Sequence, residues 1–264
     1  MTAISDLFER LRRDGRKALM PFVTAGDPDI GTTAAVIRAL ANAGADLCEV
    51  GIPYSDPIAD GPVIQASFQR ALDAGFKLRD AMELGTKLND LAMPRVTMVS
   101  YAIIHRVGLD RYIDDAMSAG FSGAIVPDLL VEEADQMAHC CRQKGFDLIQ
   151  LVTPTTPRER QVRIADSSSG FLYYVSVTGI TGERRELPPD LVDSVAWLRE
   201  RTELPICIGF GISGPDTAAQ LAPVSDGLIV GSAIVRRIAG SGDQETAANS
   251  VAEFVQELRR AIEA

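Results

Sequence analysis

Two hydrophobic periodicities alternate along the whole chain. Short runs rich in β-branched and other apolar residues, typical of buried strands, are each followed by a longer stretch in which apolar positions recur with the period of a helix. Eight of the short runs predict strands, at residues 18–23, 47–51, 95–99, 123–126, 147–152, 171–176, 205–208 and 227–230. Helices are predicted between and after them, at residues 31–43, 63–89, 109–119, 131–144, 157–165, 189–201, 215–221 and 245–264.

This alternation predicts the fold class. Eight strand–helix units in 264 residues, without a Pro- or Ser-rich linker, favour an α/β protein with a single (β/α)8 TIM-barrel domain over residues 1–264. An extra amphipathic helix, at roughly residues 4–13, precedes the first strand and is expected to cover the bottom of the barrel. The competing architecture is an open, doubly wound sheet. It is disfavoured because no chain crossover is visible and the candidate chemistry is spread around one face.

Composition excludes several classes of protein. The chain has 26 basic and 36 acidic side chains, a net charge of −10, and this balance argues against general nucleic-acid binding. No stretch approaches 18 consecutive apolar residues, and the N-terminal segment lacks the apolar core of a secretory signal. The four cysteines show no C-x-x-C spacing, so neither a disulfide framework nor a zinc site is indicated. We therefore expect a cytoplasmic protein without a membrane span.

The active site of a (β/α)8 barrel lies at the C-terminal ends of its strands. None of the four lysines falls at such a position, which disfavours a Schiff-base mechanism. The two histidines, His105 and His139, are too far apart in the pattern for a His-rich metal site, and no metal is expected.

Carboxylates are better placed. Glu49 lies near the end of an apolar strand, where strand alternation can point it into the barrel mouth. A charge in that position is unfavourable unless it is functional or is paired with an Arg or a backbone N–H. The loop that follows, GIPYSDPIADGP (51–62), contains Asp56 and Asp60. For Asp56 a turn-forming role is equally acceptable, whereas Asp60 is the better functional candidate. Asp128, after the fourth strand, could equally be a helix N-cap.

A glycine-rich segment follows the seventh predicted strand. Residues 207–214, CIGFGISG, nominally match the G-x-G-x-x-G pattern of dinucleotide binding. The position in the chain argues against that function, and no acidic residue ends the next strand. Gly231-Ser232 then opens a short helix after the eighth strand. Glycine loops and helix N-termini after strands seven and eight are typical of a phosphate site in a barrel, with turn-forming glycine as the alternative.

The loop after the sixth predicted strand, SVTGITGERRELPP (176–189), combines glycines and threonines with a charged segment. Such a loop suits a lid that closes over bound substrate. A plain surface connection is the alternative.

Together these residues resemble the tryptophan synthase alpha subunit family, over essentially the whole chain. The segment around Glu49 and Asp60 is highly specific for that family. The matching motifs are MPFVTAGDPD (20–29), LCEVGIPYSDPIADGPVIQ (47–65), VPDL (126–129), SVTGITG (176–182), GFGIS (209–213) and GSAIV (231–235).

The resemblance implies a (β/α)8 lyase that splits indole-3-glycerol phosphate into indole and glyceraldehyde 3-phosphate in tryptophan biosynthesis. It also assigns roles: Glu49 and Asp60 match the family's catalytic carboxylates. Its substrate-binding positions fall on Phe22, Tyr173, Thr181, Gly182, Gly211, Gly231 and Ser232.

The resemblance further implies an alpha2beta2 complex with a beta subunit. The alpha chain itself is expected to need no cofactor, and pyridoxal phosphate belongs to the partner. One departure is visible, because Ile103 stands where many members have Asn, near the expected partner surface. Two rival functions remain, another phosphate-binding barrel such as a sugar-phosphate isomerase, and a non-catalytic activating subunit.

Overall fold

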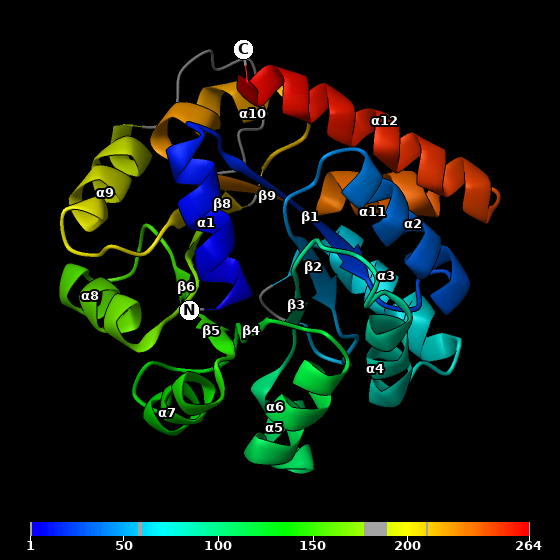
Figure 1. Cartoon of the computed structure of the whole chain (residues 1–264), viewed down its shortest axis with the longest axis horizontal. Helices are drawn as coiled ribbons and strands as arrows, with labels where there is room; N and C mark the ends of the chain where they lie inside the picture. Colours follow the sequence, from blue (N-terminus) through cyan, green and yellow to red (C-terminus); the bar gives the residue numbers. More distant parts are fainter. Residues whose placement is uncertain (1, 58–59, 177–188, 210, 264) are drawn as a thin grey trace.

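Nine parallel strands form one sheet in the order β5-β4-β3-β2-β1-β9-β8-β7-β6 (Figure 1). The computed structural model describes residues 2–57, 60–176, 189–209 and 211–263, and all element counts refer to these residues. The strands are β1 (Ala18–Thr24), β2 (Cys48–Gly51), β3 (Arg95–Met98), β4 (Gly123–Ile125), β5 (Asp147–Ile149), β6 (Leu151–Val152), β7 (Leu172–Val175), β8 (Ile206–Gly209) and β9 (Gly227–Val230).

The two edges of the sheet meet, and so form a barrel, at the fifth strand predicted from the sequence. β5 and β6 are two parts of that strand, at 147–152, and only Gln150 separates them. β5 pairs with β4 and β6 pairs with β7, so the two ends of the sheet order are consecutive in the sequence. The backbone N–H of Tyr173 donates a hydrogen bond of 3.1 Å to the Gln150 carbonyl across this junction. The predicted eight-stranded α/β barrel is thereby confirmed.

Helices surround the barrel (Figure 1). None of the helices in the described part of the chain is long and apolar enough to cross a membrane. Their bounds are α1 (Ala3–Arg13), α2 (Ile30–Asn42), α3 (Pro62–Asp73), α4 (Leu78–Lys87), α5 (Tyr101–Val107), α6 (Leu109–Ser118), α7 (Asp135–Lys144), α8 (Arg158–Ser167), α9 (Pro189–Arg199), α10 (Pro215–Leu221), α11 (Ser232–Ala239) and α12 (Gln244–Glu263), with a 3-10 turn at Ala222–Val224.

The helix predictions need two corrections. The stretch predicted as one helix at 63–89 is two helices, α3 and α4, because Gly75 adopts a left-handed φ of 86° that ends the first. Helix α5 lies outside the predicted helices; it begins where the Ser100 side chain accepts the N–H of Ala102. Ile103 of this helix is partly buried against the apolar layer between strands and helices.

Two apolar layers stabilise the fold, one between the strands and the outer helices and one inside the barrel. Helix α1 belongs to the inner layer, as expected, and in Figure 1 it lies across the middle of the barrel. The ring centroids of Phe8 and Phe171 are 5.8 Å apart at the end of the barrel that α1 covers. The α1 side chains that enter the inner layer are Ile4, Leu7, Phe8 and Leu11.

Helix α3 is attached to the end of β1 by two polar contacts. The hydroxyls of Thr24 and Ser67 are 2.6 Å apart in a buried hydrogen bond. The Arg70 guanidinium donates to both oxygens of the buried Asp27 carboxylate, at 2.8 and 2.7 Å. A bidentate pair of this kind has a well-defined geometry. These contacts attach the middle and the C-terminal half of α3 to the end of β1, and they thereby fix the helix that follows the loop at the barrel mouth.

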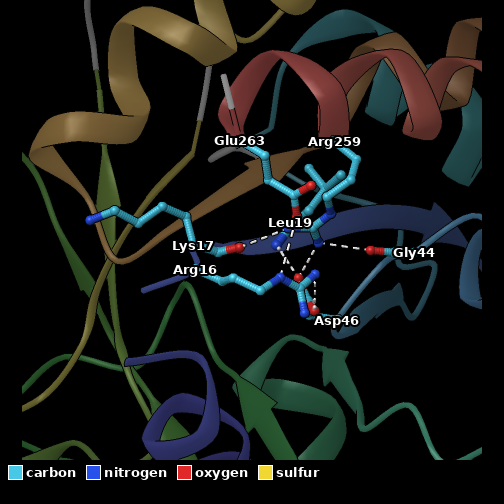
Figure 2. A network of polar contacts seen from close by, with 7 residues as sticks. All are labelled: Arg16, Lys17, Leu19, Gly44, Asp46, Arg259 and Glu263. Atoms are coloured by element: carbon cyan, nitrogen blue, oxygen red, sulfur yellow. Dashed lines mark hydrogen bonds and ion pairs between the residues drawn. The ribbon is translucent and has the colours of Figure 1, made fainter. Parts of the chain in front are cut away.

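A polar network at the opposite end joins the C-terminal helix to the barrel (Figure 2). Asp46 accepts the Leu19 N–H at 2.9 Å and also pairs with Arg259 of α12. Arg259 donates further to the carbonyls of Gly44, at 2.7 Å, and Lys17, at 3.0 Å. Since α12 also packs along α2, this network closes the ring of helices at the chain's end (Figure 1).

Candidate active site

Glu49 projects into the open end of the barrel. On β2, Leu47 faces the inner layer while Cys48 and Val50 face the outer one, so Glu49 points inward as the alternation predicted. Its side chain is 2% exposed and lines a cavity of about 440 Å³. The Oε2 atom is buried and has no hydrogen-bond partner among the described residues.

Burial, reinforced by the charge of Asp60, raises the pKa of Glu49 to about 8. The Arg or backbone partner that would make this carboxyl purely structural is not found in the described part of the chain. A carboxyl in that state is protonated near neutral pH and can serve as a general acid.

Asp60 lines the same cavity from the loop before α3. The Asp60 N–H donates to the Pro57 carbonyl at 3.0 Å, and Asp60 lies two positions ahead of Pro62 at the helix start. The Oδ2 atom is buried without a hydrogen-bond partner in the described chain. Burial raises the pKa of Asp60 to about 6, so the group is ionised at neutral pH.

The other two carboxylates considered above have structural partners. Asp56 is exposed and accepts a hydrogen bond of 2.8 Å from the neighbouring Ser55 hydroxyl, as a turn residue does. Asp128 accepts the Ser100 hydroxyl at 2.6 Å and the Tyr101 N–H at 2.7 Å, so it supports the start of α5.

Two aromatic residues line the cavity. Phe22 comes from β1 and Tyr173 from β7. Each ring lies against a glycine of a neighbouring strand. A β-carbon at Gly51 would be 2.6 Å from the Phe22 Cε2 atom, and one at Gly209 would be 2.6 Å from two carbons of the Tyr173 ring. Any larger residue at these positions would displace the rings that shape the cavity.

The glycine-rich end of the cavity contains Gly211, Gly231 and Ser232. Gly211 has a φ of 80°, a left-handed conformation that side chains disfavour. Gly231 is the N-cap of α11 and Ser232 is its first residue. The first amides of a helix have no partners within it and carry the positive end of its dipole. This end of the cavity can therefore bind an anion.

The match to known proteins extends over nearly the entire chain. The family model described as tryptophan synthase alpha chain matches residues 8–263. The chain belongs to the tryptophan synthase alpha chain family. A curated alpha chain from Rhodopirellula baltica is 68% identical over 100% of both chains. One from Caldanaerobacter subterraneus is 43% identical and covers 99% of this chain and 100% of its own length.

Solved structures agree with this assignment. The tryptophan synthase subunit alpha from Legionella pneumophila superposes with a TM-score of 0.91 at 33% identity, covering 100% of this chain and 99% of its own. A chain of the tryptophan synthase from Mycobacterium tuberculosis also gives 0.91, at 30% identity, and covers 100% of this chain and 99% of its own. The predicted family and TIM-barrel fold of an alpha chain are thus confirmed.

Several lining residues of this alpha-chain cavity were missed by the sequence reasoning. Met98 and Ile229 occupy inward positions of β3 and β9, which strand alternation alone could have identified. Arg236 lies one helical turn beyond Ser232, a spacing that places both on the same face of α11. The remaining unpredicted lining residues are Gly61, Ile64, Ile212 and Ser213.

A second cavity, of about 380 Å³, adjoins the first and shares Asp60, Met98 and Tyr173 with it. Its other walls come from the ends of β4 and β6 with the loops that follow them, and from Arg160 and Ile164 of α8 and Val175 of β7. The barrel mouth of this alpha chain therefore offers room beyond the two carboxylates. No group of three potential metal-ligating His, Cys, Asp or Glu side chains occurs within the described ranges. Thr181, Gly182 and most of the predicted lid at 176–189 lie outside the described residues.

Proposed function

We propose that Glu49 and Asp60 carry out the alpha reaction of tryptophan synthase in this cavity. As a member of the alpha chain family, the chain is a lyase of tryptophan biosynthesis that cleaves indole-3-glycerol phosphate to indole and glyceraldehyde 3-phosphate. The observation that carries the assignment of residues is Glu49, a 2% exposed carboxyl with an unpartnered oxygen at the cavity and a pKa of about 8. Few purely structural roles are compatible with that environment.

The proposed chemistry is a retro-aldol cleavage in which protons balance. Protonated Glu49 gives its proton to indole C3, forming a cationic indolenine. The resulting carboxylate then accepts the proton of the glycerol hydroxyl next to the scissile bond. The C–C bond breaks, its electron pair returns to the indole ring, and the hydroxyl carbon becomes the aldehyde. Glu49 ends the cycle protonated, as it began.

Asp60 is proposed to hold the indole N–H and to stabilise the cation at the indolenine stage. Its pKa of about 6 keeps it ionised while Glu49 is still protonated, and the two groups thereby have different roles at one pH. Phe22 and Tyr173 are proposed to pack against the indole ring. The phosphate is proposed to bind at Gly211, Gly231 and Ser232, with Thr181 and Gly182 assigned from their motif.

All proton transfers in this scheme use side chains of the chain itself, so we propose that it holds no metal or organic cofactor of its own. The alpha chain is a partner of the tryptophan synthase beta subunit. We propose an alpha2beta2 assembly in the cytoplasm, with pyridoxal phosphate confined to the beta subunit and with residues 1–264 of this chain forming one barrel domain.

The deciding experiment measures indole release from indole-3-glycerol phosphate, with and without a beta subunit. The proposal expects release by the alpha chain alone and an increase when the beta subunit is added. A sugar-phosphate isomerase would release no indole under either condition. A non-catalytic activating subunit would change the beta reaction without releasing indole itself, and either result would contradict the assignment.

A further inference from the structure

Arg236 lies at the edge of the active-site cavity, at the end where Gly211, Gly231 and Ser232 are found. It is four residues beyond Ser232 on α11, so both side chains lie on one face of the helix. The Arg236 side chain is exposed and forms no hydrogen bond or ion pair within the described part of the chain. A guanidinium is thus available beside the predicted phosphate-binding amides.

Neighbouring arginines are already engaged elsewhere. Arg237 places its guanidinium 4.0 Å from the centre of the Phe254 ring, towards α12. Arg160 lines the adjoining cavity but pairs with Glu132 at 2.7 Å. Among the described residues that line the two cavities, Arg236 is consequently the cation without a partner.

The charge of the molecule makes such a cation significant. The chain carries a net charge of −10, and the cavity contains two carboxyl groups, Glu49 and Asp60. A phosphate monoester with a charge of about −1.5 to −2 near neutral pH is repelled by the ionised Asp60 and by the net negative charge of the chain, whereas Glu49 is protonated and neutral at that pH. A fixed positive group at the cavity edge offsets that repulsion and increases the rate at which an anion enters.

We propose that Arg236 is a further substrate-recognition residue of this site, whose guanidinium pairs with the substrate phosphate held at the N-terminus of α11. The inference rests on the proposed function, because it assumes a phosphate-bearing substrate at Gly231 and Ser232. Arg236 would act on binding and entry of the anion. The proton transfers at Glu49 and Asp60 would not depend on it.

The kinetic test compares Arg236→Gln, Arg236→Lys and Arg236→Glu with the control Arg237→Gln, using indole-3-glycerol phosphate. An exposed charge-assisted pair predicts that Arg236→Gln raises KM roughly 3- to 10-fold with kcat within about 2-fold of wild type. Arg236→Lys should restore most of the affinity, and Arg236→Glu should raise KM further. Arg237→Gln should retain the wild-type KM. The decline of kcat/KM with added salt should be shallower for Arg236→Gln.

A binding measurement makes the result independent of turnover. Calorimetric titration with glycerol 3-phosphate should show weaker binding to Arg236→Gln, whereas indole, which lacks phosphate, should bind both proteins equally. Equal glycerol 3-phosphate affinities for Arg236→Gln, Arg237→Gln and wild type would overturn the role of Arg236 while leaving the proposed function intact. A wild-type chain that binds glycerol 3-phosphate but releases no indole would instead contradict the proposed function.

Discussion

Gly209 of β8 faces the ring of Tyr173 on β7 so closely that a β-carbon at position 209 would lie 2.6 Å from two ring carbons. The two strands are neighbours in the barrel, and Tyr173 pairs with Cys207. The glycine thus provides the space in which the Tyr173 ring, which lines the cavity, packs against β8. This role differs from the phosphate-loop role that the G-x-G-x-x-G spacing first indicates.

Gly209→Ala should consequently lower kcat/KM by roughly 10- to 100-fold, because the Tyr173 ring that lines the cavity must shift from its position. Overpacking should also reduce the free energy of unfolding by about 1–3 kcal/mol. Gly214→Ala is the matched control, since position 214 has extended backbone and open space around its β-carbon. Steady-state kinetics of both variants tests the relationship. Equal activities for the two would refute it.

The pH dependence of activity follows from the two raised pKa values. Glu49 must be protonated to act as an acid, and this form is lost as pH rises through about 8. Asp60 must be ionised to stabilise the cation, and this form is lost as pH falls through about 6. The profile of kcat/KM should therefore be bell-shaped, with its maximum between these values.

The substrate phosphate also titrates near pH 6, so kcat should be recorded together with kcat/KM. Activity is thus lost at low pH, on the acidic limb of the profile, through protonation of Asp60 and through protonation of the substrate phosphate. Asp60→Asn separates these two causes. This variant should lower kcat more than it weakens substrate binding, and its kcat profile should lack the acidic limb. An unchanged acidic limb in kcat would remove Asp60 from the proposed mechanism.

Glu49→Gln should abolish most of the activity, by at least ~10²–10⁴-fold, because an amide cannot exchange the proton. Substrate binding should persist, and calorimetry with indole-3-glycerol phosphate can measure it. Retention of near-normal indole release would show that another group supplies the proton.

Glu49→Gln should also have a higher free energy of unfolding than the wild type at pH 8. The folded protein keeps the Glu49 proton up to about pH 8, whereas an unfolded chain releases it near 4.5. Stability therefore falls as pH rises between these values, by up to about 1.4 kcal/mol for each pKa unit. Gln does not titrate, so the advantage of Glu49→Gln in urea unfolding should shrink as pH approaches 4.5. A pH-independent advantage would contradict the raised pKa.

Ser232→Asp places a carboxylate at the first residue of α11, beside the proposed phosphate position. Repulsion between two charges about 4 Å apart in a partly screened site amounts to a few kcal/mol, so KM should rise on the order of 100-fold. Ser232→Asn, of similar size and without the charge, should have a much smaller effect. Indole affinity should be unchanged in both. Loss of indole binding in parallel would indicate misfolding.

Asp46→Asn should lower stability without lowering kcat. Asp46 accepts the Leu19 N–H and pairs with Arg259 at the end of the barrel opposite the cavity (Figure 2). Weakening charge-assisted hydrogen bonds at this carboxylate, whose side chain is 10% exposed, costs about 1.5–3 kcal/mol in urea unfolding. Arg16→Gln is the control, because Arg16 is 41% exposed and 3.7 Å from Asp46. It should change stability by less than about 1 kcal/mol. Equal losses would show that the buried pair with Arg259 is not the stabilising contact.

Local pattern alone determined much of this protein. The two-residue alternation on β2 was sufficient to orient Glu49 inward, because neighbouring side chains of a strand point to opposite faces. The same periodicities predicted eight strand–helix units, and the motif around Glu49 and Asp60 was sufficient to identify the family.

Other features depended on contacts between residues far apart in the chain. Asp60 follows Glu49 by only eleven positions, yet its pKa of about 6 results from burial that the folded barrel mouth imposes. The space that Gly209 leaves for Tyr173, and the position of Arg236 at the cavity edge, likewise arise only when separate strands and helices meet. Periodicity reports which face of an element is apolar. It carries no information about which atom of another element will occupy the facing space, and that was decided by the closure of the barrel.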